Sequence, residues 1–179
     1  MKKIYDVDIN WEGLIEQADR EYKFQPGLTE KLDNHTDDFT ETTLLEIILW
    51  KTNRYPEINA DLLTAINDLR KGFSSNKARL LLKQLLLLKG FDLPMASTVL
   101  RFACPDHLQI IDQRVYRFIT EGTDIFKKPY NDDRKVDMYF DYLERLKEVC
   151  LKYDIPFNKA DRIIYQLDKE LNADIPINY

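Results

Sequence analysis

A glycine-centred turn between two helical stretches is the segment best suited to bind an anion. A leucine-rich stretch ends at Gly90, which is well placed to stop a helix in a left-handed conformation. Asp92 can cap the next helix, and Pro94 is acceptable in its first turn. The first amides of a helix lack partners within it, so they can donate to a phosphate. The sequence therefore predicts a phosphate-binding site at this turn.

An acid between an apolar pair and a short helix is the second notable feature. Ile110 and Ile111 precede Asp112, and Val115, Phe118 and Ile119 follow it at helical spacing up to Gly122. An aspartate directly before such a helix is a common N-cap, so capping alone would account for Asp112. This structural interpretation stands beside the functional one that follows.

Together the two features resemble the helix-hairpin-helix DNA glycosylase superfamily. Its pattern is Leu-x-Gly-hydrophobic-Gly, a helix with an early small residue, and then a hydrophobic pair, an Asp and a short helix. The match lies within 88–117 and is carried by Leu88, Gly90, Phe91, Ala96, Ile110, Ile111, Asp112 and Val115. The resemblance implies a two-lobed, all-α fold with the hairpin motif near 78–104.

The resemblance also implies a reaction and a partner, double-stranded DNA containing a damaged or mispaired base. Asp112 would be catalytic: its carboxylate would stabilise the cationic sugar as the N-glycosidic bond breaks and would activate the attacking water. Pro94 stands eighteen positions earlier, where bifunctional members hold a Schiff-base lysine. Since proline has no amine, monofunctional base removal without lyase activity is expected. The DNA contacts expected near the hairpin are Lys89, Gly90, Phe91, Leu93, Met95 and Arg114.

Two departures from the family pattern affect these expectations. Asp92 replaces the second glycine of the hairpin, which puts negative charge beside the expected phosphate and should lower non-specific affinity. The chain has only two cysteines, Cys104 and Cys150, so the four-cysteine iron–sulfur cluster of some members is not expected. His35 and His107 lack partners at ligand spacing. No metal and no cofactor are therefore expected, and the cysteines are interpreted as packing residues.

A cluster of aromatic and basic residues at 50–55 is a second candidate for DNA contact. In the family, the corresponding helix end and loop border the lesion pocket and wedge into the duplex. Trp50, Lys51 and Arg54 are therefore expected to stack on a base and to touch the backbone. The alternative is a tryptophan packed at a helix end with basic side chains extended beside it.

Charge is distributed unevenly along this acidic chain, whose net charge is −5. Residues 70–119 contain nine bases and three acids, so the remainder carries −11. No acid occurs from residue 70 to residue 91, so one segment could face phosphates. The alternative is that several of these lysines and arginines only solvate helix faces.

The elements that must position these residues are all expected to be helices. Helical spacing of apolar residues predicts helices over 11–22, 40–53, 60–71, 75–88, 93–103, 112–122, 132–153 and 159–171. The expected caps include Asn10, Thr40 or Asp38, Asn59, Ser74 or Ser75, and Asn158. The stretch around Pro26 and Gly27 is interpreted as a turn, followed by a polar segment at 33–38.

The chain is expected to form a single structural unit over 1–179 with two lobes. The central lobe covers about 38–122, and the second combines 1–37 with 123–179. No apolar run is long enough for a membrane span, and no signal core is apparent, so a cytoplasmic setting and no membrane partner are expected. Oligomeric state is left open.

Two alternatives to a glycosylase also remain open. One is a non-catalytic helix-hairpin-helix DNA-binding module, and the other is an acidic helical interaction protein with no nucleic-acid role. The acidic pI of about 5.2 is compatible with both.

Overall fold

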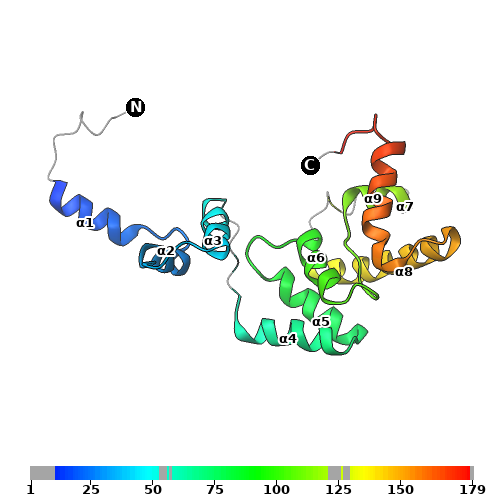
Figure 1. Cartoon of the computed structure of the whole chain (residues 1–179), viewed down its shortest axis with the longest axis horizontal. Helices are drawn as coiled ribbons and strands as arrows, with labels where there is room; N and C mark the ends of the chain where they lie inside the picture. Colours follow the sequence, from blue (N-terminus) through cyan, green and yellow to red (C-terminus); the bar gives the residue numbers. More distant parts are fainter. Residues whose placement is uncertain (1–10, 53–55, 57, 121–125, 127–129, 178–179) are drawn as a thin grey trace. The chain divides into compact units, whose positions relative to one another are not determined.

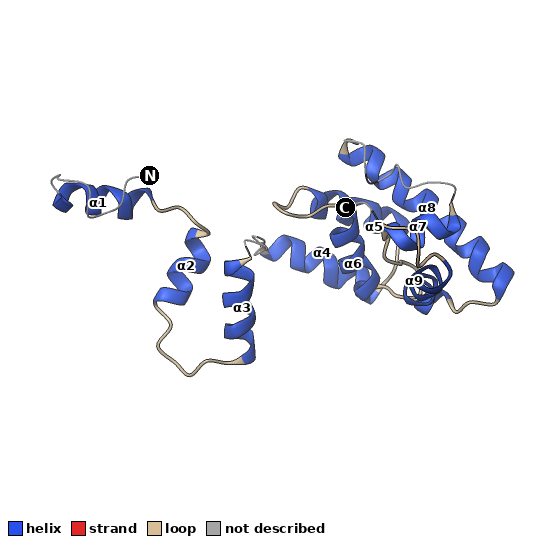
Figure 2. Ribbon diagram, turned by 90° about the horizontal axis from the view of Figure 1, so that it is seen from above, coloured by secondary structure: helices blue, strands red, loops and turns tan. Residues whose placement is uncertain are grey.

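The computed structural model describes residues 11–52, 56, 58–120, 126 and 130–177 (Figure 1). Within this part every regular element is a helix and no strand occurs (Figure 2). The predicted all-α class is therefore confirmed. The chain divides into two compact units, Met1–Tyr55 and Pro56–Tyr179.

The first unit contains three described helices. These are α1 (Trp11–Glu21), α2 (Pro26–Asp33) and α3 (Glu41–Lys51). Thr40 caps α3, as expected, through a reciprocal bond with Thr43. The turn predicted around Pro26 and Gly27 is wrong, because these residues begin α2, and proline is acceptable in the first turn of a helix.

In the second unit, the described residues form six α-helices and a short 3₁₀ turn. They are α4 (Ala60–Lys71), α5 (Ser75–Leu86), α6 (Leu93–Ala103), α7 (Gln113–Ile119), α8 (Asp132–Tyr153), the 3₁₀ turn Phe157–Lys159 and α9 (Ala160–Leu171). Helix α5 packs against α4, α6 and α8, while α7 packs against α8 and α9 (Figure 1). One continuous apolar core joins these helices, and it includes both cysteines, as expected for packing residues.

Most predicted helix starts in the second unit are confirmed. Asn59, Asp92 and Asp112 each cap the following helix with a side-chain oxygen. The prediction for Asn158 was wrong, because α9 begins later, after the 3₁₀ turn, with Lys159 at its N-cap. The expected cap Asn10 lies outside the described residues.

The unit boundaries differ from the expected lobe boundaries. Residues 38–55 belong to the first compact unit, and the C-terminal helices α8 and α9 belong to the second. Helices α5 and α7 both contact α8, so residues after 123 share a core with the predicted central lobe. The two-lobed arrangement, with 1–37 beside the C-terminal segment, stays a prediction.

The described helices do not meet the requirements of a membrane span. None combines the length and the apolar character that crossing a bilayer requires.

Candidate functional site

The turn between α5 and α6 has the backbone geometry that the sequence predicts. Gly90 has φ 82°, so its left-handed conformation is confirmed. The amide of Phe91 donates to the carbonyl of Leu88 at 3.0 Å and closes the turn. Among the described residues, none accepts the amide of Gly90 and none outside α6 accepts the amide of Met95, so both could donate to an anion.

The carboxylate of Asp92 is neutralised by a lysine from a distant helix. It accepts the amide of Leu93 at 2.8 Å and pairs with Lys135 Nζ of α8 at 2.9 Å. Burial opposes ionisation of Asp92, but the bonds from Lys135 and Leu93 offset it and hold its pKa below the ordinary value. The negative charge expected beside the turn therefore has a counter-ion that sequence reasoning missed.

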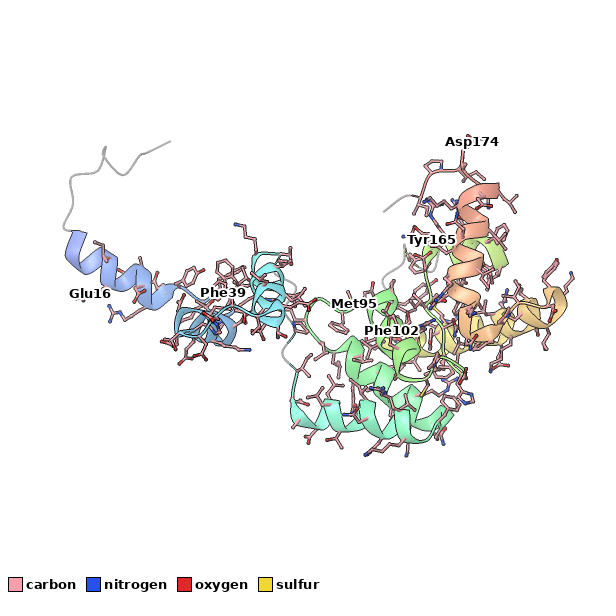
Figure 3. All side chains as sticks on the ribbon, in the orientation of Figure 1. Glu16, Phe39, Met95, Phe102, Tyr165 and Asp174 are labelled. Carbon is pink, nitrogen blue, oxygen red and sulfur yellow. The ribbon has the colours of Figure 1, made fainter. Side chains whose placement is uncertain are left out.

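The predicted contact residues around the turn differ in accessibility. Lys89 and Gly90 are exposed. On α6, Met95 is 45% exposed and Phe102 is 66% exposed (Figure 3). Phe91 is half-buried against the core. Leu93 is buried in the core, so only its main chain could contact a ligand.

Asp112 is partly exposed and stands at the start of α7. Its Oδ1 accepts the amides of Arg114 at 2.7 Å and Val115 at 3.3 Å. No described residue donates a hydrogen bond to Oδ2. The capping role is thus confirmed, and it occupies only one of the two carboxylate oxygens.

Three buried side chains bond to the main chain just before Asp112. Tyr139 donates to the carbonyl of Gln109 at 2.9 Å, and Tyr142 donates to the carbonyl of Ile110 at 2.7 Å. The hydroxyl of Ser97 accepts the next amide, that of residue 111, at 3.2 Å. The segment 109–111 is therefore fixed against both α6 and α8.

Ser97 also places this segment near the α5–α6 turn. It lies four residues after the first residue of α6, which is about 6 Å along the helix axis. Because Ser97 contacts residue 111 directly, Asp112 starts its helix beside the first turns of α6. The main chain directly before Asp112 therefore contacts the helix that follows the predicted phosphate-binding turn.

Arg114 is tied to a carboxylate that the sequence analysis did not single out. Its Nη1 lies 3.2 Å from Oδ2 of Asp168 on α9, and Arg117 donates two bonds of 2.8 Å to the same carboxylate. Asp168 is buried and Arg114 is 21% exposed. In this arrangement the guanidinium of Arg114 clamps α7 to α9 and is not presented freely to DNA.

Most bases of the segment 70–119 are paired with acids of the same unit. Six of the nine form ion pairs, and these are Lys71 with Asp68, Arg79 with Asp137, Lys83 with Asp133, Arg101 with Asp161, and Arg114 and Arg117 with Asp168. The other three, Arg70, Lys77 and Lys89, form no ion pair with a described residue. The positive potential that the sequence predicts is thus largely compensated by α8 and α9.

In the first unit, Trp50 is held within the α2–α3 pair. Its Nε1 donates to Thr29 Oγ1 at 2.9 Å, and its ring packs edge-on against Phe24 with centroids 5.1 Å apart. The tryptophan is half-buried and Lys51 is exposed at the end of α3. Arg54 lies outside the described residues. The packing alternative therefore accounts for the position of Trp50, and the predicted stacking on a base stays a prediction.

The described residues contain no group of three or more His, Cys, Asp or Glu side chains that could hold a metal ion. Of the two histidines, His107 stacks on Phe73, with ring centroids 4.1 Å apart and an angle of 9° between the planes. His35 packs beside Phe39 at 5.3 Å. Both imidazoles thus have aromatic neighbours.

Known families and structures do not match this chain. Comparison with family models, with curated proteins and with solved structures finds no match.

Proposed function

We propose that this chain is a DNA N-glycosylase that removes a damaged or mispaired base by hydrolysis. The observation that carries the proposal is the local geometry of Asp112: one carboxylate oxygen caps α7, and the other accepts no bond from a described residue. Ser97 joins the segment before Asp112 to the first turns of α6. A strand held at the α5–α6 turn would thus lie close to this carboxylate.

The chemistry follows from the charge that develops as a glycosidic bond breaks. The sugar becomes an oxocarbenium ion, and a fixed carboxylate stabilises it and can accept a proton from the attacking water. Asp112 supplies this group. Pro94 has no amine, so strand cleavage through an imine at that position is not part of the proposal.

DNA would be held mainly through the main chain at the hairpin turn. The amides near Gly90 and Met95, together with the exposed Lys89, would bind one phosphate without reading sequence. The pairing of Asp92 with Lys135 supports this, because it offsets the negative charge beside the turn.

The test is formation of abasic sites in a panel of duplexes, each containing one damaged or mispaired base. The variant Asp112→Asn removes the charge but keeps a good N-cap residue, so the helix is retained. Base release by the native chain and its loss in the variant, with duplex binding unchanged, would support the enzyme. Binding without release in any duplex would favour a non-catalytic hairpin module.

A second candidate is an acidic helical protein with no nucleic-acid role. The extensive pairing of the bases in 70–119 favours it, because little positive charge is left for phosphates. Absence of affinity for every duplex at low ionic strength would support this candidate and reject the glycosylase.

A further inference from the structure

Two tyrosines of α8 fix consecutive carbonyls in the loop before Asp112. Tyr139 and Tyr142 donate to the carbonyls of Gln109 and Ile110, at 2.9 and 2.7 Å. Their side chains are 0% and 1% exposed. The Tyr139 bond is buried, so losing that hydroxyl would leave the Gln109 carbonyl without this donor and shielded from water, whereas the Tyr142 bond is part-buried and its loss would remove one fixed contact of the Ile110 carbonyl.

Both phenols remain donors throughout the neutral range. Burial raises the pKa of Tyr139 and Tyr142 well above the ordinary value, and nearby acids raise it further. Asp112 is among the acids whose charge raises the pKa of Tyr142.

Ser97 is the third side chain that bonds to the main chain of 109–111, and it comes from a different helix, α6. Its hydroxyl is fully buried, donates to the carbonyl of Pro94 at 2.8 Å and accepts the amide of Ile111 at 3.2 Å. This one side chain thus connects the first turn of α6 to the residue directly before Asp112. Residues 109–111 are consequently bonded to α6 on one side and to α8 on the other.

Helix α7 could not position the Asp112 carboxylate by itself. It has seven residues, about two turns, and the capping bonds fix the carboxylate only relative to α7. The position of that carboxylate relative to the α5–α6 turn depends on the residues that lead into it. Catalytic groups lose much of their effect when they are misplaced by about 1 Å.

We infer that Ser97, Tyr139 and Tyr142 are positioning residues, which fix where the Asp112 carboxylate stands relative to the α5–α6 turn. The inference rests on the proposed function, in which a strand held at that turn presents its glycosidic bond to Asp112. The three residues touch neither substrate nor water in this scheme and act only through the main chain of 109–111.

Single-turnover base release and duplex binding test the inference in Tyr142→Phe and Ser97→Ala. Each variant removes one hydroxyl and keeps the rest of the side chain, and we expect the rate constant to fall about tenfold or more. The Kd for the same duplex should stay within about twofold, because the turn itself is unchanged. The matched control is Tyr153→Phe, which removes an exposed hydroxyl from the same helix α8 and should alter neither quantity.

Amide hydrogen exchange gives a second readout that does not require activity. The amides of Arg114 and Val115 donate to Asp112, and we expect both to exchange faster in Tyr142→Phe and Ser97→Ala than in the control. Should Ser97→Ala fail to fold, Tyr139→Phe takes its place, because phenylalanine keeps the ring in the core.

The outcomes separate the inference from the proposed function. If the native chain releases no base, the proposed function fails, and amide exchange alone tests the inference. Faster exchange of the Arg114 and Val115 amides in the variants than in the control then supports positioning of the Asp112 segment, and equal exchange overturns it. If base is released at the native rate in both hydroxyl-deletion variants, the inference is overturned while the proposed function stands.

Discussion

The guanidinium of Arg117 donates two parallel hydrogen bonds, each of 2.8 Å, to the buried carboxylate of Asp168. Arg114 approaches the same carboxylate from one turn earlier in α7, and Asn172 donates to it from the end of α9. This cluster joins α7, which begins at Asp112, to the C-terminal helix.

Removing the shared carboxylate should therefore destabilise the second unit. Asp168→Asn leaves two guanidinium groups without their counter-charge, and breaking a buried ion pair in this way costs about 3 kcal/mol. Urea unfolding of the variant and the native chain measures the difference in the free energy of unfolding. Lys147→Ala, which removes an exposed pair with Glu144, is the control and should change that free energy by less than about 1 kcal/mol. A similar effect of both changes would contradict the role given to Asp168.

The same cluster should make stability depend on pH in the acid range. Burial opposes ionisation of Asp168, but the bonds from Arg117 and Asn172 outweigh it and lower its pKa. A carboxylate whose pKa is lower in the folded state contributes stability above its unfolded pKa of about 3.9, and that contribution is lost as pH falls through the folded value. Unfolding followed from pH 6 down to pH 2 should show a weaker pH dependence below about pH 4 in Asp168→Asn. Parallel curves for the two proteins would refute this.

The fold class and most helix starts are predictable because they depend on neighbouring residues. Asn59, Asp92 and Asp112 precede apolar periodicity directly, and each caps its helix as expected. Helix α2 was missed because its eight residues bury only Leu28, which is too short a pattern to outweigh Pro26 and Gly27.

The partners of the site could not be predicted because they come from distant parts of the chain. Asp168 is 51 residues from Arg117, and no local pattern indicates that they meet. The sequence gives a weak indication that α5 and α8 meet, because two bases of α5 and two acids of α8 are each four residues apart. In the structure Arg79 pairs with Asp137, and Lys83 pairs with Asp133. Spacing alone does not tell whether such charges face each other or face DNA.

The pairing of the bases limits how strongly DNA binding can depend on salt. With only Arg70, Lys77 and Lys89 unpaired among the nine, and Lys71 weakly paired, the bases of 70–119 should contribute no more than about −4 to the slope of log K against log salt. Fluorescence anisotropy of a labelled duplex between 50 and 200 mM salt, roughly the range where such slopes are read, measures it.

A matched pair of lysines shows whether the turn makes this contact. Lys89→Ala should make the slope shallower by about 1, and Lys169→Ala, which changes an exposed lysine of α9, should leave it unchanged. A slope of about −6 or steeper for the native chain would contradict this limit, because the three unpaired bases and Lys71 could not account for it.

Any residue other than glycine at position 90 should lower the free energy of unfolding, although there is space for a side chain. No atom lies within 4 Å of an added Cβ, so the cost of Gly90→Ala comes from its φ of 82° and should be about 1–2 kcal/mol. Gly72→Ala is the control, because Gly72 also has open space but an extended backbone with φ −165°. It should change stability by less than about 0.5 kcal/mol. Thermal unfolding of both variants gives the comparison, and equal losses would exclude backbone strain as the cause.

Base release by Asp112→Asn beside Asp106→Asn tests the central claim most directly. Asp106 is an exposed acid in the same loop, so its variant removes the same charge without touching the start of α7. In a duplex where the native chain makes abasic sites, we expect Asp112→Asn to slow base release at least about a hundredfold and Asp106→Asn to keep the native rate. Equal rates in all three proteins, or no abasic site in any duplex, would contradict this claim.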